Sequence, residues 1–333
     1  MTNHGIFLTK FFARLTAALL ATLLVSVPLH AQVKFKYGLV QSKADAGFFW
    51  MAQEKGFFKK HGVEVEYLQF RGDKDVARAL LAGEVDAAEI SPAAELNAID
   101  RGADLRFIGS SMPGFPYALY VKKDITSWEQ LKGKTFGVSS PGSVPEIIAR
   151  EMLIRKGVDD STIQIVNAGG SGLRIKALVG GKIDAAASSS EYIPEADKLG
   201  IKVMALAADL VPEYPRFVIV AFDETLKAKR ETVINFLAAY MEGMDYALKH
   251  RDETLKLSAK INDKPVNDPT LAHMFDEVFA KGYLSVKSEV PRAKIDWLQN
   301  VLLKHGTIRK KVDLDKYIDE SYRKEALKRA DLR

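Results

Sequence analysis

The sequence predicts an α/β protein with two similar lobes, which are joined by two crossing segments and face each other across a cleft. Three observations lead to this prediction: an internal repeat, an alternation of strand and helix patterns, and two proline-marked breaks. The chain has 333 residues, a net charge of +5 and no cysteine. This length is enough for two domains that each bury a hydrophobic core.

The internal repeat relates two ten-residue segments. Ala79–Ala88 reads ALLAGEVDAA and Ala177–Ala186 reads ALVGGKIDAA, so six of the ten positions are identical. Upstream of each copy, Tyr37–Val40 has a counterpart in Phe136–Ser139. A solenoid needs at least three repeats. Two copies therefore indicate a pair of similar lobes.

Strand and helix patterns alternate within each copy. In the first copy the predicted strands are 35–40, 63–70 and 85–90, and the predicted helices are 47–60, 73–82 and 93–101. In the second copy the predicted strands are 135–138, 163–166 and 183–187, with helices from 143 and over 171–179. We expect Asp73 to cap one helix, and Ser143 and Glu146 to form a capping box on another. The alternation predicts parallel sheets with helices on their faces.

The two breaks, Met112–Pro116 and Val211–Pro215, divide the chain into lobes. After the second break, a strand at 217–222 is followed by amphipathic helices near 227–250, 268–281, 292–304 and 315–329. The predicted boundaries are 32–112 with 216–333 for lobe 1, 116–210 for lobe 2, and about 112–116 and 211–215 for the hinge segments. Two crossings permit closure by hinge bending.

The first 31 residues have the layout of a cleaved secretory signal peptide. Lys10 and Arg14 precede an apolar run, Leu15–Val27, and a small residue, Ala31, stands at the expected cleavage point. The run is shorter than the roughly 18 residues that a membrane-spanning helix needs. We therefore expect that the protein is exported to the periplasm and that residues 1–31 are removed by cleavage.

Three segments resemble those of a known family. Trp50–Val65 (WMAQEKGFFKKHGVEV), Ala82–Ala88 (AGEVDAA) and Trp128–Val138 (WEQLKGKTFGV) are similar to scaffold motifs of the sulfonate, nitrate, taurine and thiamine-precursor binding proteins of ABC importers. The resemblance implies a periplasmic-binding-protein type II fold with two Rossmann-like lobes. It implies a monomer that binds a small-molecule ligand and the ABC permease subunits in the inner membrane, without cofactor, metal, catalytic residues or nucleic acid.

Ligands of open α/β sheets bind beyond the carboxyl ends of the strands. The expected ligand-binding residues follow from this rule: Gln41, Ser42, Phe48, Phe49, Trp50, Arg71 and Ser91 in lobe 1, and Ser140, Gly142, Ser143, Gly170, Ser171 and Glu191 in lobe 2. Glycine and serine loops before helices offer N–H donors to an anionic group. These residues suit an anionic, heteroaromatic or zwitterionic ligand.

Several roles stay open at this point. Ser143 and Ser171 are also plausible helix caps, and successive helical positions diverge by about 100°, so Phe48–Trp50 cannot all face the cleft. Arg71 is the expected partner of a ligand anion, whereas Arg174 is expected to face solvent.

Two other functions compete with transport. One is the same-fold synthase of a pyrimidine precursor, which the absence of cysteine disfavours. The other is ligand sensing through a receptor. The mature histidines are too scattered to indicate a metal site.

Overall fold

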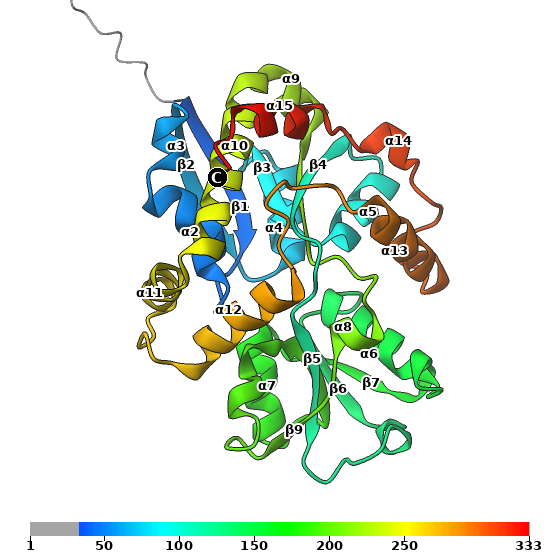
Figure 1. Ribbon diagram of the computed structural model, residues 1–333. Helices are drawn as coiled ribbons and strands as arrows, with labels where there is room; N and C mark the ends of the chain where they lie inside the picture. The colour runs from blue at the N-terminus through cyan, green and yellow to red at the C-terminus, as the bar shows by residue number, and fades with distance from the viewer. Residues whose placement is uncertain (1–32, 333) are drawn as a thin grey trace, which may run out of the picture. The chain divides into compact units, whose positions relative to one another are not determined.

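The computed structural model describes Val33–Leu332, and the predicted signal peptide lies outside the described residues. The described chain contains two five-stranded sheets with helices packed on them (Figure 1). Among the described helices, none has the length and apolar character needed to cross a membrane.

The first sheet takes its strands from two separate stretches of the chain, which lie before and after the strands of the second sheet. Its strand order is β2 (Val63–Phe70), β1 (Val33–Val40), β3 (Ala87–Ile90), β10 (Phe217–Phe222) and β4 (Leu105–Met112). Strand β1 is parallel to β2 and β3, whereas β10 is antiparallel to both of its neighbours.

The second sheet takes all its strands from the chain between β4 and β10. Its order is β7 (Gln164–Asn167), β6 (Thr135–Val138), β8 (Ala185–Ser189), β5 (Tyr117–Lys122) and β9 (Ile201–Leu206). Strand β6 is parallel to β7 and β8, and β5 is antiparallel to β8 and β9.

The two sheets therefore share one topology. The repeated strands β1, β2 and β3 correspond to β6, β7 and β8, and β10 occupies the position in the first sheet that β5 occupies in the second. The prediction of purely parallel sheets is wrong, because each sheet includes an antiparallel strand that enters it from a crossing segment. The described residues 33–332 belong to one compact unit, and the lobe boundaries stay a prediction.

Helices cover both faces of the first sheet. They are α2 (Ala46–Glu54), α3 (Phe57–Lys60), α4 (Asp73–Leu81), α5 (Pro92–Asp100), α9 (Asp223–Ala228), α10 (Arg230–Lys249), α11 (Arg251–Asn262), α12 (Pro269–Lys281), α13 (Arg292–Lys304), α14 (Leu314–Tyr317) and α15 (Ser321–Arg329). Strand β10 shows the layering, because Ile219 packs in the core with α10 and Val220 packs in the core with α4, α5 and α13. Period-two alternation places successive side chains on opposite faces.

The second sheet carries fewer helices. They are α6 (Val144–Arg155), α7 (Ser171–Val179), α8 (Ala207–Leu210) and the short 3₁₀ helices η1 (Glu129–Leu131), η2 (Asp160–Thr162) and η3 (Ser190–Glu195). In Figure 1 this part of the chain runs from teal through green. Its inner residues, such as Phe136 and Ile148, belong to the same buried cluster as Leu298 of α13.

The two crossing segments are held together by one side chain. Lys294 of α13 donates from Nζ to the carbonyl oxygens of Pro113 and Pro212, each at 2.8 Å. Beside them, Phe115 packs against Tyr214 with ring centroids 4.8 Å apart. Burial lowers the pKa of Lys294.

The structure differs from three local predictions, which concern one helix and two helix caps. The predicted helix 47–60 is two helices, because Gly56 adopts φ +73° between α2 and α3. Asp73 does not cap α4: it is the first helical residue, and its Oδ1 accepts a hydrogen bond from Ser91 N at 2.7 Å. The capping box is not formed: the Ser143 side chain makes no cap bond, and Glu146 accepts from Gly142 N at 2.8 Å, whereas Ser143 N donates to Ser140 O.

Candidate functional site

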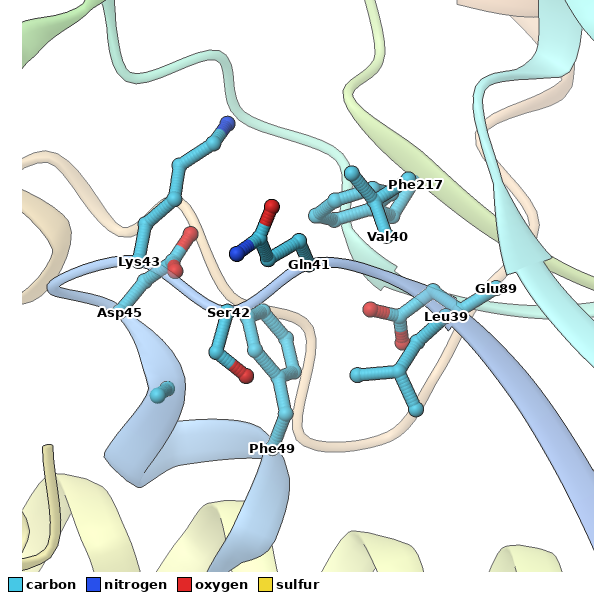
Figure 2. Close-up of a pocket in the computed structure, with 10 residues that line it drawn as sticks. Leu39, Val40, Gln41, Ser42, Lys43, Asp45, Phe49, Glu89 and Phe217 are labelled. Carbon is cyan, nitrogen blue, oxygen red and sulfur yellow. The ribbon is translucent and has the colours of Figure 1, made fainter. Parts of the chain in front are cut away.

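A small pocket lies at the carboxyl end of β1, where the following loop enters α2 (Figure 2). Carboxyl groups of Asp45 and Glu89, the ammonium of Lys43, and the rings of Phe49 and Phe217 contribute to its wall. Its space is about that of one water molecule. The complete lining is Leu39, Val40, Gln41, Ser42, Lys43, Asp45, Ala46, Phe49, Glu89 and Phe217.

Glu89 is a buried acid at this pocket, with 2% of its surface exposed. Its Oε2 accepts hydrogen bonds from the phenols of Tyr240 at 2.7 Å and Tyr37 at 3.3 Å. Burial raises the pKa of Glu89 to about 7, against the opposing effect of the hydrogen bond from Tyr240. Near neutral pH this carboxyl group therefore exists in both protonation states.

Three cations surround the phenol of Tyr117 beside the pocket. Lys43 Nζ lies 5.3 Å from the centroid of its ring, and the guanidinium carbon of Arg216 lies 6.0 Å from it. Burial alone would raise the pKa of Tyr117, but the charges of Lys43, Arg216 and Arg174 outweigh burial and lower it to about 7. The site thus has a positive potential that favours a negative charge.

Arg174 lies inside the second-sheet unit rather than in solvent, so the prediction that it faces solvent is wrong. It is 2% exposed. Its guanidinium donates to Ala187 O at 3.1 Å, Gly169 O at 2.7 Å and Ser171 Oγ at 3.1 Å. Among the described residues no carboxylate forms an ion pair with Arg174, so its charge is not neutralised by a direct partner.

Arg216 reaches the same region from the second crossing segment. It is 3% exposed and stacks over Phe217, with its guanidinium carbon 3.7 Å from the ring centroid. Its only ion pair within the described chain is a long one, 3.4 Å from Nη1 to Asp73 Oδ1. Its remaining donors leave capacity for an anionic ligand.

Two hydrogen bonds connect the first-sheet side of the site with the second-sheet side. Glu191 Oε2 of η3 accepts from Ala44 N at 2.9 Å, and Lys74 Nζ, in the first turn of α4, donates to Pro141 O at 2.6 Å. Burial raises the pKa of Glu191. These contacts join the loops on which the sequence predicts ligand binding.

Several predicted residues lie in or beside the pocket. Gln41, Ser42 and Phe49 line it. Ser91 is buried and shares a hydrogen bond of 2.9 Å with Tyr214 Oη, and it also caps α5. Ser171 holds Arg174, as described above.

Other predicted residues lie elsewhere. Phe48 stacks on Phe275 with centroids 5.2 Å apart, and Trp50 packs on Tyr67 at 4.5 Å, where it lines a second pocket with Lys34 and Gln53. Phe49 is therefore the one member of the aromatic trio at the first pocket. Arg71 is exposed, and no described residue forms an ion pair or hydrogen bond with it.

The remaining predicted residues belong to the two glycine–serine loops. Ser140 N donates to Ser143 Oγ at 3.3 Å, and Gly142 adopts φ +72°. Gly170 is the extended residue that precedes α7. These loops lie at the N-termini of α6 and α7, where N–H groups favour anions.

Sequence reasoning missed Glu89, Tyr117 and Arg216 as site residues. A signal existed for Glu89, since a charged residue within the apolar run AAEI of a central strand is costly unless it is satisfied. Tyr117 and Arg216 adjoin the proline-marked breaks, which were interpreted only as hinges.

Residues 43–254 match the family model described as NMT1/THI5 like. A protein of Brucella abortus, provisionally named a binding protein, is 24% identical over 255 residues, covering 74% of this chain and 77% of its own length. A 4-amino-5-hydroxymethyl-2-methylpyrimidine phosphate synthase of Saccharomyces cerevisiae, THI13, is 26% identical over 264 residues, covering 74% and 75%.

Solved structures show the same fold. The aliphatic sulphonate binding protein SsuA of Escherichia coli aligns with a TM-score of 0.68 and 18% identity, covering 86% of this chain and 92% of its own. The nitrate-binding protein NrtA of Synechocystis PCC 6803 aligns with a TM-score of 0.74 and 14% identity, covering 90% of each chain. The predicted periplasmic binding protein fold is confirmed.

Proposed function

This chain belongs to the NMT1/THI5-like family, and on that basis we propose that it is an exported solute-binding protein. In this proposal a small ligand, anionic or heteroaromatic, binds in the cleft between the two lobes. The loaded protein then delivers the ligand to the permease subunits of an ABC transporter in the inner membrane. The protein acts as a periplasmic monomer after removal of residues 1–31.

The observation that carries this proposal is the convergence of cations on Tyr117. Lys43 comes from a first-sheet loop, Arg174 from a second-sheet helix and Arg216 from a crossing segment. A ligand anion among them would receive charge-assisted hydrogen bonds from both lobes. Such an anion would favour the closed arrangement, because only that arrangement brings all three cations to it.

Ligand entry requires the lobes to separate. The pocket has space for about one water molecule, and the hydrogen bonds Glu191–Ala44 and Lys74–Pro141 connect the facing loops. We propose that these contacts open by bending at the two crossing segments and re-form around the ligand.

A synthase of the pyrimidine precursor is the second candidate, and the similarity to THI13 favours it. The absence of cysteine counts against it, because the resemblance associates that enzyme with a cysteine-rich segment. Ligand sensing is the third, and it differs from transport only in the docking partner.

Native mass spectrometry of protein from the periplasmic fraction tests the proposal. We expect one small molecule per chain, released chemically unchanged after long incubation. A reproducible product formed from that molecule would favour the synthase instead.

A pair of lysine and arginine variants tests the location of the site. Lys43→Gln is expected to weaken binding of the copurified molecule about tenfold or more, since it removes a cation beside Tyr117. Arg71→Gln is the matched control, because Arg71 is exposed and unpaired among the described residues. Equal losses of binding affinity in both variants would contradict an anion site located beside Tyr117 alone and would assign Arg71 a role in binding the anion.

A further inference from the structure

The carboxyl group of Glu89 is held by hydroxyl groups of the protein. Its Oε2 accepts hydrogen bonds from the phenols of Tyr37 and Tyr240, and a side-chain hydrogen bond with Ser111 acts to lower the pKa of Glu89. Glu89 contributes to the pocket wall, and in Figure 2 its carboxyl group points toward Phe49. These hydroxyl groups fix the orientation of the carboxyl group at the pocket.

A second polar atom at the same pocket lacks a partner. Ser42 Oγ is buried and makes no hydrogen bond within the described chain, although Ser42 lines the pocket. Buried hydroxyl groups are nearly always hydrogen-bonded. The unpaired hydroxyl of Ser42 therefore marks a position that a polar group of another molecule can fill, in a pocket that Glu89 also lines.

A buried acid need not bind anything, and Glu95 illustrates this. Glu95 of α5 is fully buried, and both of its carboxyl oxygens lack a partner. It lines neither of the two pockets described above, and it packs among the core residues between α5 and the first sheet. Glu89 differs in two respects, because phenols orient its carboxyl group and because it lines the first pocket.

We propose that Glu89 is a specificity-determining residue that, with Ser42, binds an N–H donor of the ligand. This inference rests on the proposed binding function. The ionised state of Glu89 offers only acceptor atoms, and we assign an amino, ammonium or ring N–H group of the ligand as the donor that binds this state. The ligand then carries a nitrogen donor at Glu89 and an anionic group at the cations around Tyr117.

The charges around the pocket agree with such a two-ended ligand. Glu89 and Lys43 both line the pocket and lie on opposite sides of it in Figure 2, and Lys43 and Arg216 lie near the ring of Tyr117. A purely anionic ligand that extends to the Glu89 end would place negative charge against the Glu89 carboxylate, which is unfavourable in a desolvated site. A nitrogen donor at that end removes the conflict.

Matched probe pairs test the assignment by calorimetry. Each pair differs by one amino group: 4-aminobenzoate with benzoate, and 3-aminopropanesulfonate with propanesulfonate. The parent protein is expected to bind the amino member of at least one pair about tenfold more tightly, as one hydrogen bond to a charged acceptor predicts. In Glu89→Gln this preference should fall to within about threefold, because the amino member loses its acceptor while the amino-free member loses a repulsive charge.

Glu95→Gln is the control, since it neutralises an equally buried glutamate outside the pocket, and it should keep the amino preference. If Glu89→Gln does not fold, Ser42→Ala replaces it and should reduce the preference for the amino member of the pair.

Three results would overturn the inference. In the first, the parent binds the anions with no amino preference, which leaves the proposed function intact. In the second, Glu89→Gln, or Ser42→Ala in its place, retains the preference. In the third, the parent binds no probe of either pair, which contradicts the assigned ligand class; the proposed function fails as well only if native mass spectrometry also finds no bound molecule.

Discussion

Asp86 and Asp184 make matching hydrogen bonds in the two sheets. Asp86 accepts from Lys36 N at 2.9 Å and from Lys229 Nζ at 2.6 Å. Asp184 accepts from Thr135 N at 2.9 Å and from Lys122 Nζ at 2.6 Å. Each aspartate thus joins the start of a repeated strand to a lysine from a different element. These matching hydrogen bonds explain why both copies of the repeat have an aspartate at this position.

Asp184→Asn is expected to lower the free energy of unfolding by about 1–2 kcal/mol, because the amide weakens the backbone bond and removes the ion pair. Denaturant unfolding measures this. Asp209→Asn is the control, since Asp209 is largely exposed and its ion pair with Lys281 is 3.7 Å long. Equal effects in both variants would contradict the structural role of Asp184.

Tyr117 should ionise near neutral pH. Its pKa is lowered to about 7 by three cations that outweigh burial, and the chain has 11 tyrosines in all. Absorbance at about 295 nm should therefore show one phenol that titrates near pH 7, well below the ordinary range. Tyr117→Phe should abolish that transition, and Tyr246→Phe should leave it. A first tyrosine transition above about pH 9 in the parent would refute the expectation.

Glu89 should make the stability of the fold depend on pH. Its folded-state pKa of about 7 lies above the ordinary value of 4.5, so the folded protein holds this proton more tightly. Stability is therefore favoured at low pH and is lost as pH rises through about 4.5 to 7, by on the order of 3 kcal/mol.

Urea unfolding of Glu89→Gln at pH 5 and pH 8 tests this. The decrease from pH 5 to pH 8 should be smaller in the variant than in the parent. Asp45, Glu95 and Glu191 also have raised pKa values, but they remain in both proteins, so the difference isolates Glu89. An identical pH dependence would show that Glu89 titrates normally.

Lys294 should restrain hinge bending, because its ammonium binds both crossing segments at once. Lys294→Met keeps the apolar stem and removes both bonds. We expect a larger radius of gyration by small-angle scattering without ligand, and a return to the parent value with saturating ligand. Lys304→Met, on the exposed end of the same helix, is the control. No change in Lys294→Met would mean that other contacts hold the hinge, such as the packing of Phe115 on Tyr214 and the hydrogen bond from Arg216 N to Met112 O.

Much of the fold was predictable because its signals are local. The helices 171–179 and 292–304 were predicted with the bounds that the structure shows, since their apolar residues recur with helical spacing. Strand β4 was missed because nearly every residue along it is buried, which leaves no alternation to detect. The antiparallel entry of β5 and β10 depends on the crossing segments, and no local pattern encodes it.

The candidate site was less predictable, because it depends on which way side chains point. Ser171, Arg174, Ile175 and Leu178 are the buried residues of α7 and share one helix face, so the spacing of Arg174 from Ile175 and Leu178 was a usable signal. The position of Arg71 directly after a strand predicts a ligand-binding role, but that strand, β2, lies at the edge of its sheet. The central strand β3 carries the buried acid instead.

The strand order has a consequence for the sequence of events in biogenesis. The second sheet is built from one uninterrupted stretch, 117–206, whereas the first sheet lacks β10 until residues 217–222 have been made. Because a chain emerges from its N-terminus, the middle of the protein can complete its sheet while the earlier-made strands still wait for a partner between β3 and β4. Lys294 arrives later still, so the clamp on the crossing segments closes only after both sheets can exist.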